Sequence, residues 1–111
     1  MAHHKDFSGV YFTIRHILQT NKRIKDLEFV IVDNSPGTQH SIDTQNFLGG
    51  SVHNQTAGAK YFAMGDGNGT SQPRNKVFEI ATGDVVFCVD CHIVLEPFVA
   101  DRLLEFFEAN P

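Results

Sequence analysis

The sequence contains no tryptophan, only two cysteines and few basic residues. No apolar run approaches the roughly 20 residues that a membrane-spanning helix needs, so no membrane span is expected. Nine Lys and Arg against 13 Asp and Glu give a formal charge of −4, and no basic run is longer than Lys22-Arg23. A nucleic-acid partner held through its phosphates is therefore not expected, because such binding requires a basic surface.

The N-terminal residues lack the apolar core of a secretory signal peptide. The expected location is therefore the reducing cytoplasm, where Cys88 and Cys91 are expected to be free thiols. A chain of 111 residues is long enough for one domain with one core. Its ten phenylalanines predict that this core is rich in aromatic side chains.

Hydrophobic patterning predicts helices and strands in alternation. Helices are expected at 8–20, 41–48 and 71–82 and from Pro97 onward, and strands at 27–33, 59–64 and 84–90. The runs 27–33 and 84–90 are apolar and rich in β-branched residues, which is typical of strands buried on both faces. Together these segments predict an α/β fold, with a three-layer, Rossmann-like and mostly parallel sheet.

Local signals refine the expected helix ends. Ser8 is the expected N-cap of the first helix, and Ser71 or Thr70 that of the third. Gly49-Gly50 and Gly83 are expected to follow helix C-termini. In the last helix, the residues expected to face inward are Val99, Leu103 and Phe106 or Phe107.

Polar residues follow three of the expected strands. They are Asp33-Asn34-Ser35, the loop 65–74 and Asp90-Cys91-His92. Ligands of parallel α/β sheets bind beyond the carboxyl ends of the strands, so these segments are expected to form one binding site. The glycine-rich run 65–69 could hold phosphate through backbone N–H groups, although a plain flexible loop is the alternative.

Residues 87–94, FCVDCHIV, contain the Cys-x-x-Cys-His pattern of covalent haem attachment. In a strand, Cys88 and Cys91 would point to opposite faces, which disfavours both haem attachment and a redox pair. A structural zinc site is disfavoured because no second ligand pair lies at finger spacing. Asp90 and His92 would share a face and offer a partial shell for Mn²⁺ or another divalent ion. The alternative is that Asp90 caps a turn and His92 binds nothing.

The order of these segments resembles that of family 2 glycosyltransferases, which have the nucleotide-sugar-binding GT-A fold. Residues 8–18 are similar to the first helix of the family, and EFVIVDNSP at 28–36 to its second strand with an Asp-Asp-Gly-Ser-type motif. Residues 67–92 resemble its Gly-x-x-x-x-x-Arg-Asn helix, an Ala-x-Gly-Asp turn and a strand that ends in D-x-D. Here that motif reads Asp90-Cys91-His92, a D-x-H variant found in relatives that glycosylate polypeptides.

This resemblance implies a nucleotide-diphosphate sugar as the donor, an unknown acceptor, and Mn²⁺ or Mg²⁺ as the cofactor. Asp33 would hydrogen-bond the nucleobase, and Arg74 would lie near the base and the diphosphate. Asp90 would contact the ribose or the metal, and His92 would coordinate the metal. His3, with its two neighbours, would line the nucleotide pocket.

Only the nucleotide-binding part of the family is matched, so residues 1–111 are expected to form one partial GT-A-like domain. The first strand of the family and its acceptor-binding half are expected to be absent, which disfavours catalysis by this chain alone. Glu96 and Asp101 are the nearest acids downstream, and neither is marked as a catalytic base. The gap left between 27–33 and 84–90 would close by direct pairing or in a homodimer.

Two alternatives to a glycosyltransferase domain therefore remain. One is a non-catalytic α/β module that binds a nucleotide or a protein partner. The other, more remote, is a haem or redox protein that uses Cys88, Cys91 and His92.

Overall fold

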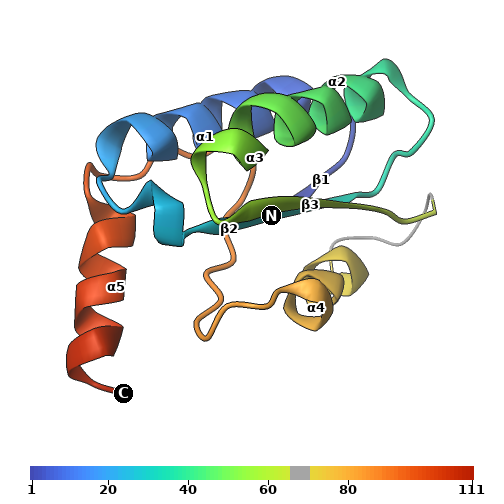
Figure 1. The fold of residues 1–111 in the computed structure, drawn as a ribbon. Helices are drawn as coiled ribbons and strands as arrows, with labels where there is room; N and C mark the ends of the chain where they lie inside the picture. The colour runs from blue at the N-terminus through green and yellow to red at the C-terminus, as the bar shows by residue number, and fades with distance from the viewer. Residues whose placement is uncertain (66–70) are drawn as a thin grey trace.

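The computed structural model describes residues 1–65 and 71–111. Its single sheet is parallel and has the strand order β1-β2-β3, formed by β1 (Ala2–His3), β2 (Glu28–Asp33) and β3 (Gly58–Ala63). The helices are α1 (Phe7–Thr20), α2 (Gln39–Phe47), α3 (His53–Gln55), α4 (Ser71–Ile80) and α5 (Val99–Ala109). Helices α1, α2 and α3 cover one face of the sheet and α4 covers the other (Figure 1). The predicted three-layer α/β fold is confirmed. Within the described residues, no helix combines the length and the hydrophobicity needed to cross a membrane.

Strand β2 lies at the centre of the sheet and is buried on both faces, as its apolar sequence predicted. Ile31 packs into a cluster with Ile14 on the α1 side of the sheet. Val30 and Val32 pack with Val77 of α4 on the opposite side. This alternation follows the two-residue period of a strand, and each such side chain contributes about 1.5–3 kcal/mol when fully buried.

Helix α1 forms where its spacing predicted, with Val10, Ile14 and Leu18 buried along one side. Its N-cap is Asp6 rather than the expected Ser8, because the Asp6 carboxylate accepts a hydrogen bond from the Gly9 amide at 3.0 Å. Asp6 has a non-helical backbone and stands three residues before that amide, which is the geometry an N-cap requires.

Helix α2 ends at Phe47, close to the expected end at residue 48, but Gly49-Gly50 do not stop the helical path as expected. The chain continues through a π-helical turn, Leu48–Val52, into α3. Leu48 and Val52 are 2% and 0% exposed and belong to the main core cluster. Their burial outweighs the roughly 1 kcal/mol that each glycine costs inside a helix.

The strand predicted at 84–90 is not formed, and these residues have no regular secondary structure. A short strand occupies the position expected to be empty: the Met1 amino group donates to Val30 O at 2.9 Å, and Val32 N donates to Met1 O at 2.9 Å. The expected direct pairing of 27–33 with 84–90 is therefore also wrong. Strand β1 is only two residues long and presents too little edge for a further strand to pair with. The homodimer remains a prediction.

Of the residues expected to face inward in α5, Val99 and Leu103 are half-buried, but the expectation is wrong for Phe106 and Phe107, which are 57% and 41% exposed. The buried residue of this helix is Asp101, whose carboxylate accepts hydrogen bonds from Lys22 N at 2.8 Å and Arg23 N at 2.9 Å. A polar anchor, rather than an apolar stripe, thus holds α5. The core is aliphatic rather than aromatic, because Phe29 is the one phenylalanine that is buried among the residues that the structure describes.

Candidate functional site

A polar hollow of about 390 Å³ lies where β1 and β2 end, beside the start of α4. It is lined by Ala2, His3, His4, Asp6, Asn34, Pro73, Arg74, Asp90, Cys91 and His92. Segments far apart in sequence therefore converge at the carboxyl ends of the strands, as predicted for a ligand site. Residues 66–70, which include most of the glycine-rich run and the candidate cap Thr70, lie outside the described residues.

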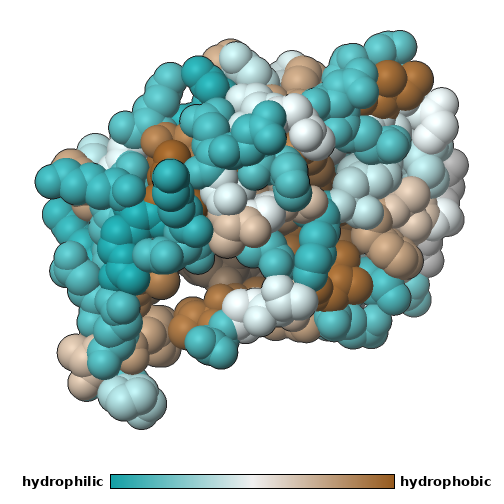
Figure 2. Space-filling model, viewed as in Figure 1, coloured by the Kyte–Doolittle hydropathy of each residue, from teal (hydrophilic) through white to brown (hydrophobic). Residues whose placement is uncertain are grey.

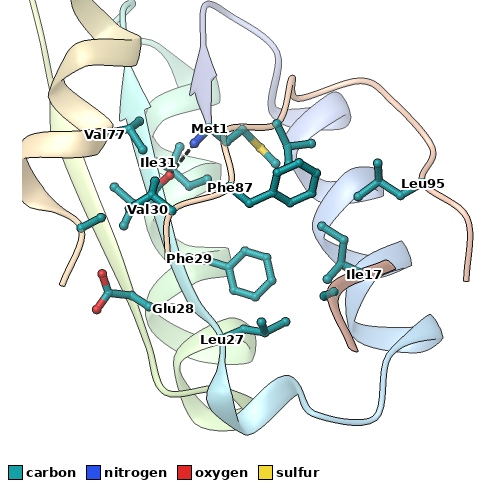
Figure 3. A pocket seen from close by; sticks show the side chains of 14 residues that line it. Met1, Ile17, Leu27, Glu28, Phe29, Val30, Ile31, Val77, Phe87 and Leu95 are labelled. Carbon is teal, nitrogen blue, oxygen red and sulfur yellow. Dashed lines mark hydrogen bonds between the residues drawn. The ribbon is translucent and has the colours of Figure 1, made fainter. Parts of the chain in front are cut away.

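A second cavity, of about 140 Å³, is mainly apolar and lies between β2 and the irregular segment 84–90. Figure 3 shows Met1, Phe29 and Phe87 around it, with the Met1 amino group bonded to Val30 O. Burial lowers the pKa of this amino group, while the nearby Cys88, Cys91 and Asp90 act in the opposite direction. This apolar cavity offers volume without convergent polar groups, so the polar hollow is the candidate functional site. In contrast to this apolar cavity, hydrophilic side chains predominate on the face of the molecule that Figure 2 shows.

Asp33 is fully buried at the end of β2 and does not line the hollow. Its carboxylate accepts hydrogen bonds from Ser35 N at 2.8 Å and Ser35 Oγ at 2.9 Å, and from Ser41 Oγ and Tyr61 OH at 2.5 Å each. Burial opposes the charged form, but hydrogen bonds from Ser41, Tyr61 and Ser35 outweigh it and lower the pKa of Asp33. The carboxylate is thus engaged by donors of the protein itself, and its contact with a nucleobase stays a prediction.

His3 brings the end of β1 against this carboxylate. Its side chain is completely buried, with Nε2 3.5 Å from Asp33 Oδ1. Nδ1 accepts a hydrogen bond from Asp6 N at 3.3 Å, so Nε2 carries the proton that faces Asp33. Burial lowers the pKa of His3, against the attraction of Asp33 and Asp6, and favours the neutral imidazole.

Arg74 and Asp90 meet across the mouth of the hollow. Nη2 of Arg74 donates to Oδ1 of Asp90 at 2.9 Å, and both side chains are about half exposed, at 52% and 56%. An ion pair this exposed contributes only about 0–1 kcal/mol to stability, so it can be exchanged for another partner at little cost. Arg74 and Asp90, two of the predicted nucleotide-binding residues, therefore lie together at the same opening.

Asp6, Cys91 and His92 form a compact group on the wall of the hollow. Asp6 Oδ2 lies 3.3 Å from Cys91 Sγ and 3.3 Å from His92 Nδ1, and Cys91 Sγ lies 3.6 Å from His92 Nδ1. Burial, together with the Asp6 carboxylate, raises the pKa of Cys91 to about 12, so its thiol is protonated at neutral pH. The described residues contain this one group of three side chains able to hold a metal ion.

The sequence did not indicate the roles of Asp6 and Cys91. The spacing Asp6-x-x-Gly9 is a helix-capping signal, but nothing in it connects residue 6 with residue 91. The two cysteines are free and line different hollows, Cys91 the polar one and Cys88 a shallow one beside Phe87. Because no strand forms at 84–90, the strand-based argument against haem attachment no longer applies, although the two thiols line different hollows.

Comparison with known protein families gives a match to glycosyl transferase family 2 over residues 2–111. Comparisons with curated proteins and with solved structures gave no match. Members of the matched family generally use a divalent metal ion. The match covers almost the whole chain, and the parallel sheet with helices on both faces agrees with a Rossmann-like GT-A fold. The chain therefore belongs to glycosyltransferase family 2.

Proposed function

We propose that the polar hollow binds a nucleoside-diphosphate sugar, from which the sugar is transferred to an acceptor. One observation carries this proposal. His3, Arg74, Asp90 and His92, which the family resemblance predicted to act together, line one hollow at the carboxyl ends of parallel strands. In a family 2 chain this is the position expected of the donor.

Arg74 is proposed to bind the diphosphate. Its guanidinium is half exposed at the opening and, among residues 1–65 and 71–111, forms a hydrogen bond with Asp90. A guanidinium matches two phosphate oxygens at once, and hydrogen bonds between charged groups are roughly twice as strong as neutral ones. Arg74 is therefore expected to exchange the weak surface pair with Asp90 for the more highly charged diphosphate.

Asp90 and His92 are proposed to hold the divalent ion, Mn²⁺ or Mg²⁺. Their donor types suit such an ion, and both side chains are exposed, at 56% and 72%, on the wall of the same hollow. When bound, the ion would neutralise negative charge that develops on the leaving diphosphate. The position of both side chains in the hollow and the family resemblance support this pair of metal ligands.

We propose that Asp33 acts indirectly on the part of the donor site that binds the nucleobase. Its buried carboxylate would hold in place the structural elements that form that part. Direct hydrogen bonding to the base would require one of its present donors, such as Ser35 Oγ, to turn away. His3 connects Asp33 to the wall of the hollow, so changes at either residue should alter nucleotide binding. The acceptor and the catalytic base are not assigned, and Asp101 is excluded as a base by its two backbone hydrogen bonds that anchor α5.

Thermal unfolding with UDP, GDP or CDP, each with and without Mn²⁺, tests the donor site. A ligand at 100 times its Kd stabilises the folded protein by about 2.7 kcal/mol. For a domain of this size the midpoint should then rise by roughly ten degrees. We expect such a shift with one nucleotide, and we expect it to require the metal.

The double variant Asp90→Ala/His92→Ala should lose the metal-dependent part of this shift. Its matched control is Asp84→Ala/His53→Ala, which removes another exposed acid and another exposed histidine away from the hollow. Equal shifts in the two double variants would contradict the metal assignment, and no shift with any nucleotide would contradict the donor site. Binding without sugar transfer or donor hydrolysis would identify the non-catalytic module.

A further inference from the structure

We propose that Asp6, Cys91 and His92 form a binding site for a thiophilic divalent ion, with Zn²⁺ as the expected ion. This ligand set differs from the pair Asp90 and His92 in the donor site and contains a thiol that the donor site does not use. The proposal goes beyond the donor site and does not depend on nucleotide binding.

The three donor atoms already have the spacing of a tetrahedral zinc site. Zinc bond lengths of about 2.0–2.2 Å to oxygen and nitrogen and 2.3 Å to sulfur place neighbouring ligand atoms about 3.4–3.6 Å apart. The observed separations are 3.3 Å between Asp6 Oδ2 and Cys91 Sγ, 3.3 Å between Asp6 Oδ2 and His92 Nδ1, and 3.6 Å between Cys91 Sγ and His92 Nδ1. Little movement is needed to place an ion between them.

Two of the ligands are held in place by the fold. Asp6 uses Oδ1 to cap α1 through the Gly9 amide, which leaves Oδ2 directed at Cys91 and His92. Cys91 is 5% exposed and belongs to the main core cluster. The start of α1 approaches this segment so closely that a Cβ at Gly9 would lie 2.2 Å from Cys91 O. The close approach that assembles the site therefore requires glycine at position 9.

The donor set determines which ion is favoured. A thiolate and an imidazole select zinc over the hard ions Mg²⁺ and Mn²⁺, which prefer oxygen ligands. On binding, a bond forms from Cys91 Sγ to the ion and the thiol proton is released to solvent. Three protein ligands leave one position of the zinc tetrahedron for water. The site therefore differs from the structural zinc site with four protein ligands that the sequence disfavoured.

His92 belongs to both ligand sets, so the two ions would compete for it. Zinc bound by Asp6, Cys91 and His92 would withdraw the imidazole from the ion that accompanies the nucleotide. Added Zn²⁺ is therefore expected to weaken the Mn²⁺-dependent stabilisation by nucleotide.

Titration of the full chain with Cd²⁺, a spectroscopic substitute for Zn²⁺, tests the site without nucleotide. We expect thiolate-to-metal charge-transfer absorption that saturates at one equivalent and is removed by added Zn²⁺. Cys91→Ser should abolish this absorption, because a hydroxyl cannot replace the thiolate. Asp6→Asn, which keeps a good helix cap, and His92→Ala should each weaken Cd²⁺ binding at least tenfold.

Cys88→Ser and Asp90→Asn are the matched controls and should leave Cd²⁺ affinity within twofold of the original. Circular dichroism of every variant verifies that it is folded. Absorption that survives Cys91→Ser, or that disappears in Cys88→Ser, would overturn the proposal, as would absence of any absorption in the unaltered chain. Loss of affinity in Asp90→Asn would assign the ion to the D-x-H pair instead. Nucleotide-induced thermal shifts are measured separately, so failure of either proposal can be recognised on its own.

Discussion

His3 and Asp33 lie against each other inside the protein, with Nε2 of the imidazole 3.5 Å from Oδ1 of the carboxylate. They are register partners in the parallel pairing of β1 and β2. Since Nδ1 of His3 also accepts a hydrogen bond from Asp6 N, the imidazole connects both strands to the start of α1. His3 also lines the polar hollow, so this contact joins the buried carboxylate to the wall of the hollow.

The stability of the protein should fall as the pH decreases from about 6.5, the ordinary pKa of histidine in an unfolded chain. Burial lowers the pKa of His3 in the folded protein, despite the opposing influence of Asp33 and Asp6. Below pH 6.5 the unfolded chain therefore binds a proton that the folded chain does not, and the free energy of unfolding decreases until the folded pKa is reached. The slope is at most about 1.4 kcal/mol per pH unit.

Urea unfolding at several pH values between 7.5 and 5.5 measures this slope, and His3→Gln should reduce it. The control is His53→Gln, at an exposed histidine, which should keep the slope of the unaltered protein. An unchanged slope in His3→Gln would show that other groups cause it. Asp33, whose pKa is lowered, should add a further loss of stability only below about pH 4, as its carboxylate becomes protonated.

Removing the Tyr61 hydroxyl should destabilise the protein by about 1.5–3 kcal/mol, the usual contribution of a hydrogen bond to a charged group. The hydroxyl donates to the buried Asp33 carboxylate at 2.5 Å, and Tyr61→Phe leaves that charge with one donor fewer. Urea unfolding measures the change. Tyr11→Phe, at a ring that is 37% exposed, is the control and should change stability by less than about 0.5 kcal/mol. Equal effects of the two variants would contradict the proposed anchoring of Asp33.

Helix α5 should loosen when the Asp101 carboxylate is removed, while the Arg23–Glu108 ion pair and the hydrogen bond from Asp101 N to Asn21 Oδ1 still connect it to the end of α1. Asp101→Ala deletes the acceptor of Lys22 N and Arg23 N, and the exposed aromatic rings of the helix cannot compensate. We expect faster amide hydrogen exchange in Val99–Ala109 and a loss of about 1–3 kcal/mol for the unpaired donors. Glu105→Ala, on an exposed position of the same helix, should leave the exchange rates unchanged. Slow exchange that persists in Asp101→Ala would show that α5 is held elsewhere.

Arg74→Ala should weaken binding of the preferred nucleoside diphosphate at least tenfold while the stability of the free protein changes by less than about 1 kcal/mol. The ion pair with Asp90 is half exposed and contributes little to folding, whereas a guanidinium on a diphosphate forms strong charge-assisted hydrogen bonds. Isothermal titration calorimetry measures the affinity. Arg102→Ala removes another exposed, ion-paired arginine, and its affinity should match that of the unaltered chain. A tenfold loss in Arg102→Ala as well would indicate a general effect of charge.

The sequence was sufficient to predict those helices and strands whose local hydrophobic pattern agrees with the burial of their residues in the structure. The spacing of Val10, Ile14 and Leu18 specifies α1, because helical spacing buries one side of a helix, and the continuous apolar β-branched run specifies β2, because it suits a strand buried on both faces. The order of these elements was enough to predict a parallel α/β sheet, and hence the edge of the sheet where the candidate site lies, while the resemblance of residues 8–18, 28–36 and 67–92 to known motifs indicated the family.

Prediction from the local sequence pattern failed where contacts between residues distant in sequence decide which structure forms. Residues 84–90 have the composition of a strand, but a strand forms only beside a partner edge, and β1 offers two residues. Helix α5 has apolar periodicity, yet it is anchored by a carboxylate that meets amides about 80 residues away. Hydrogen bonding of buried backbone groups prevailed there over the burial of aromatic rings.

The sequence by itself determined the fold class and the side chains near the strand ends, because these follow from periodicity and order along the chain, and the resemblance of its motifs indicated the family. Only the tertiary structure decided which of those side chains meet. It buried Asp33 among four donors, joined Arg74 to Asp90, and brought Asp6 to Cys91 and His92. Such contacts depend on angstrom-scale packing of α1 against the 90–92 segment, which the spacing of residues along one chain does not encode.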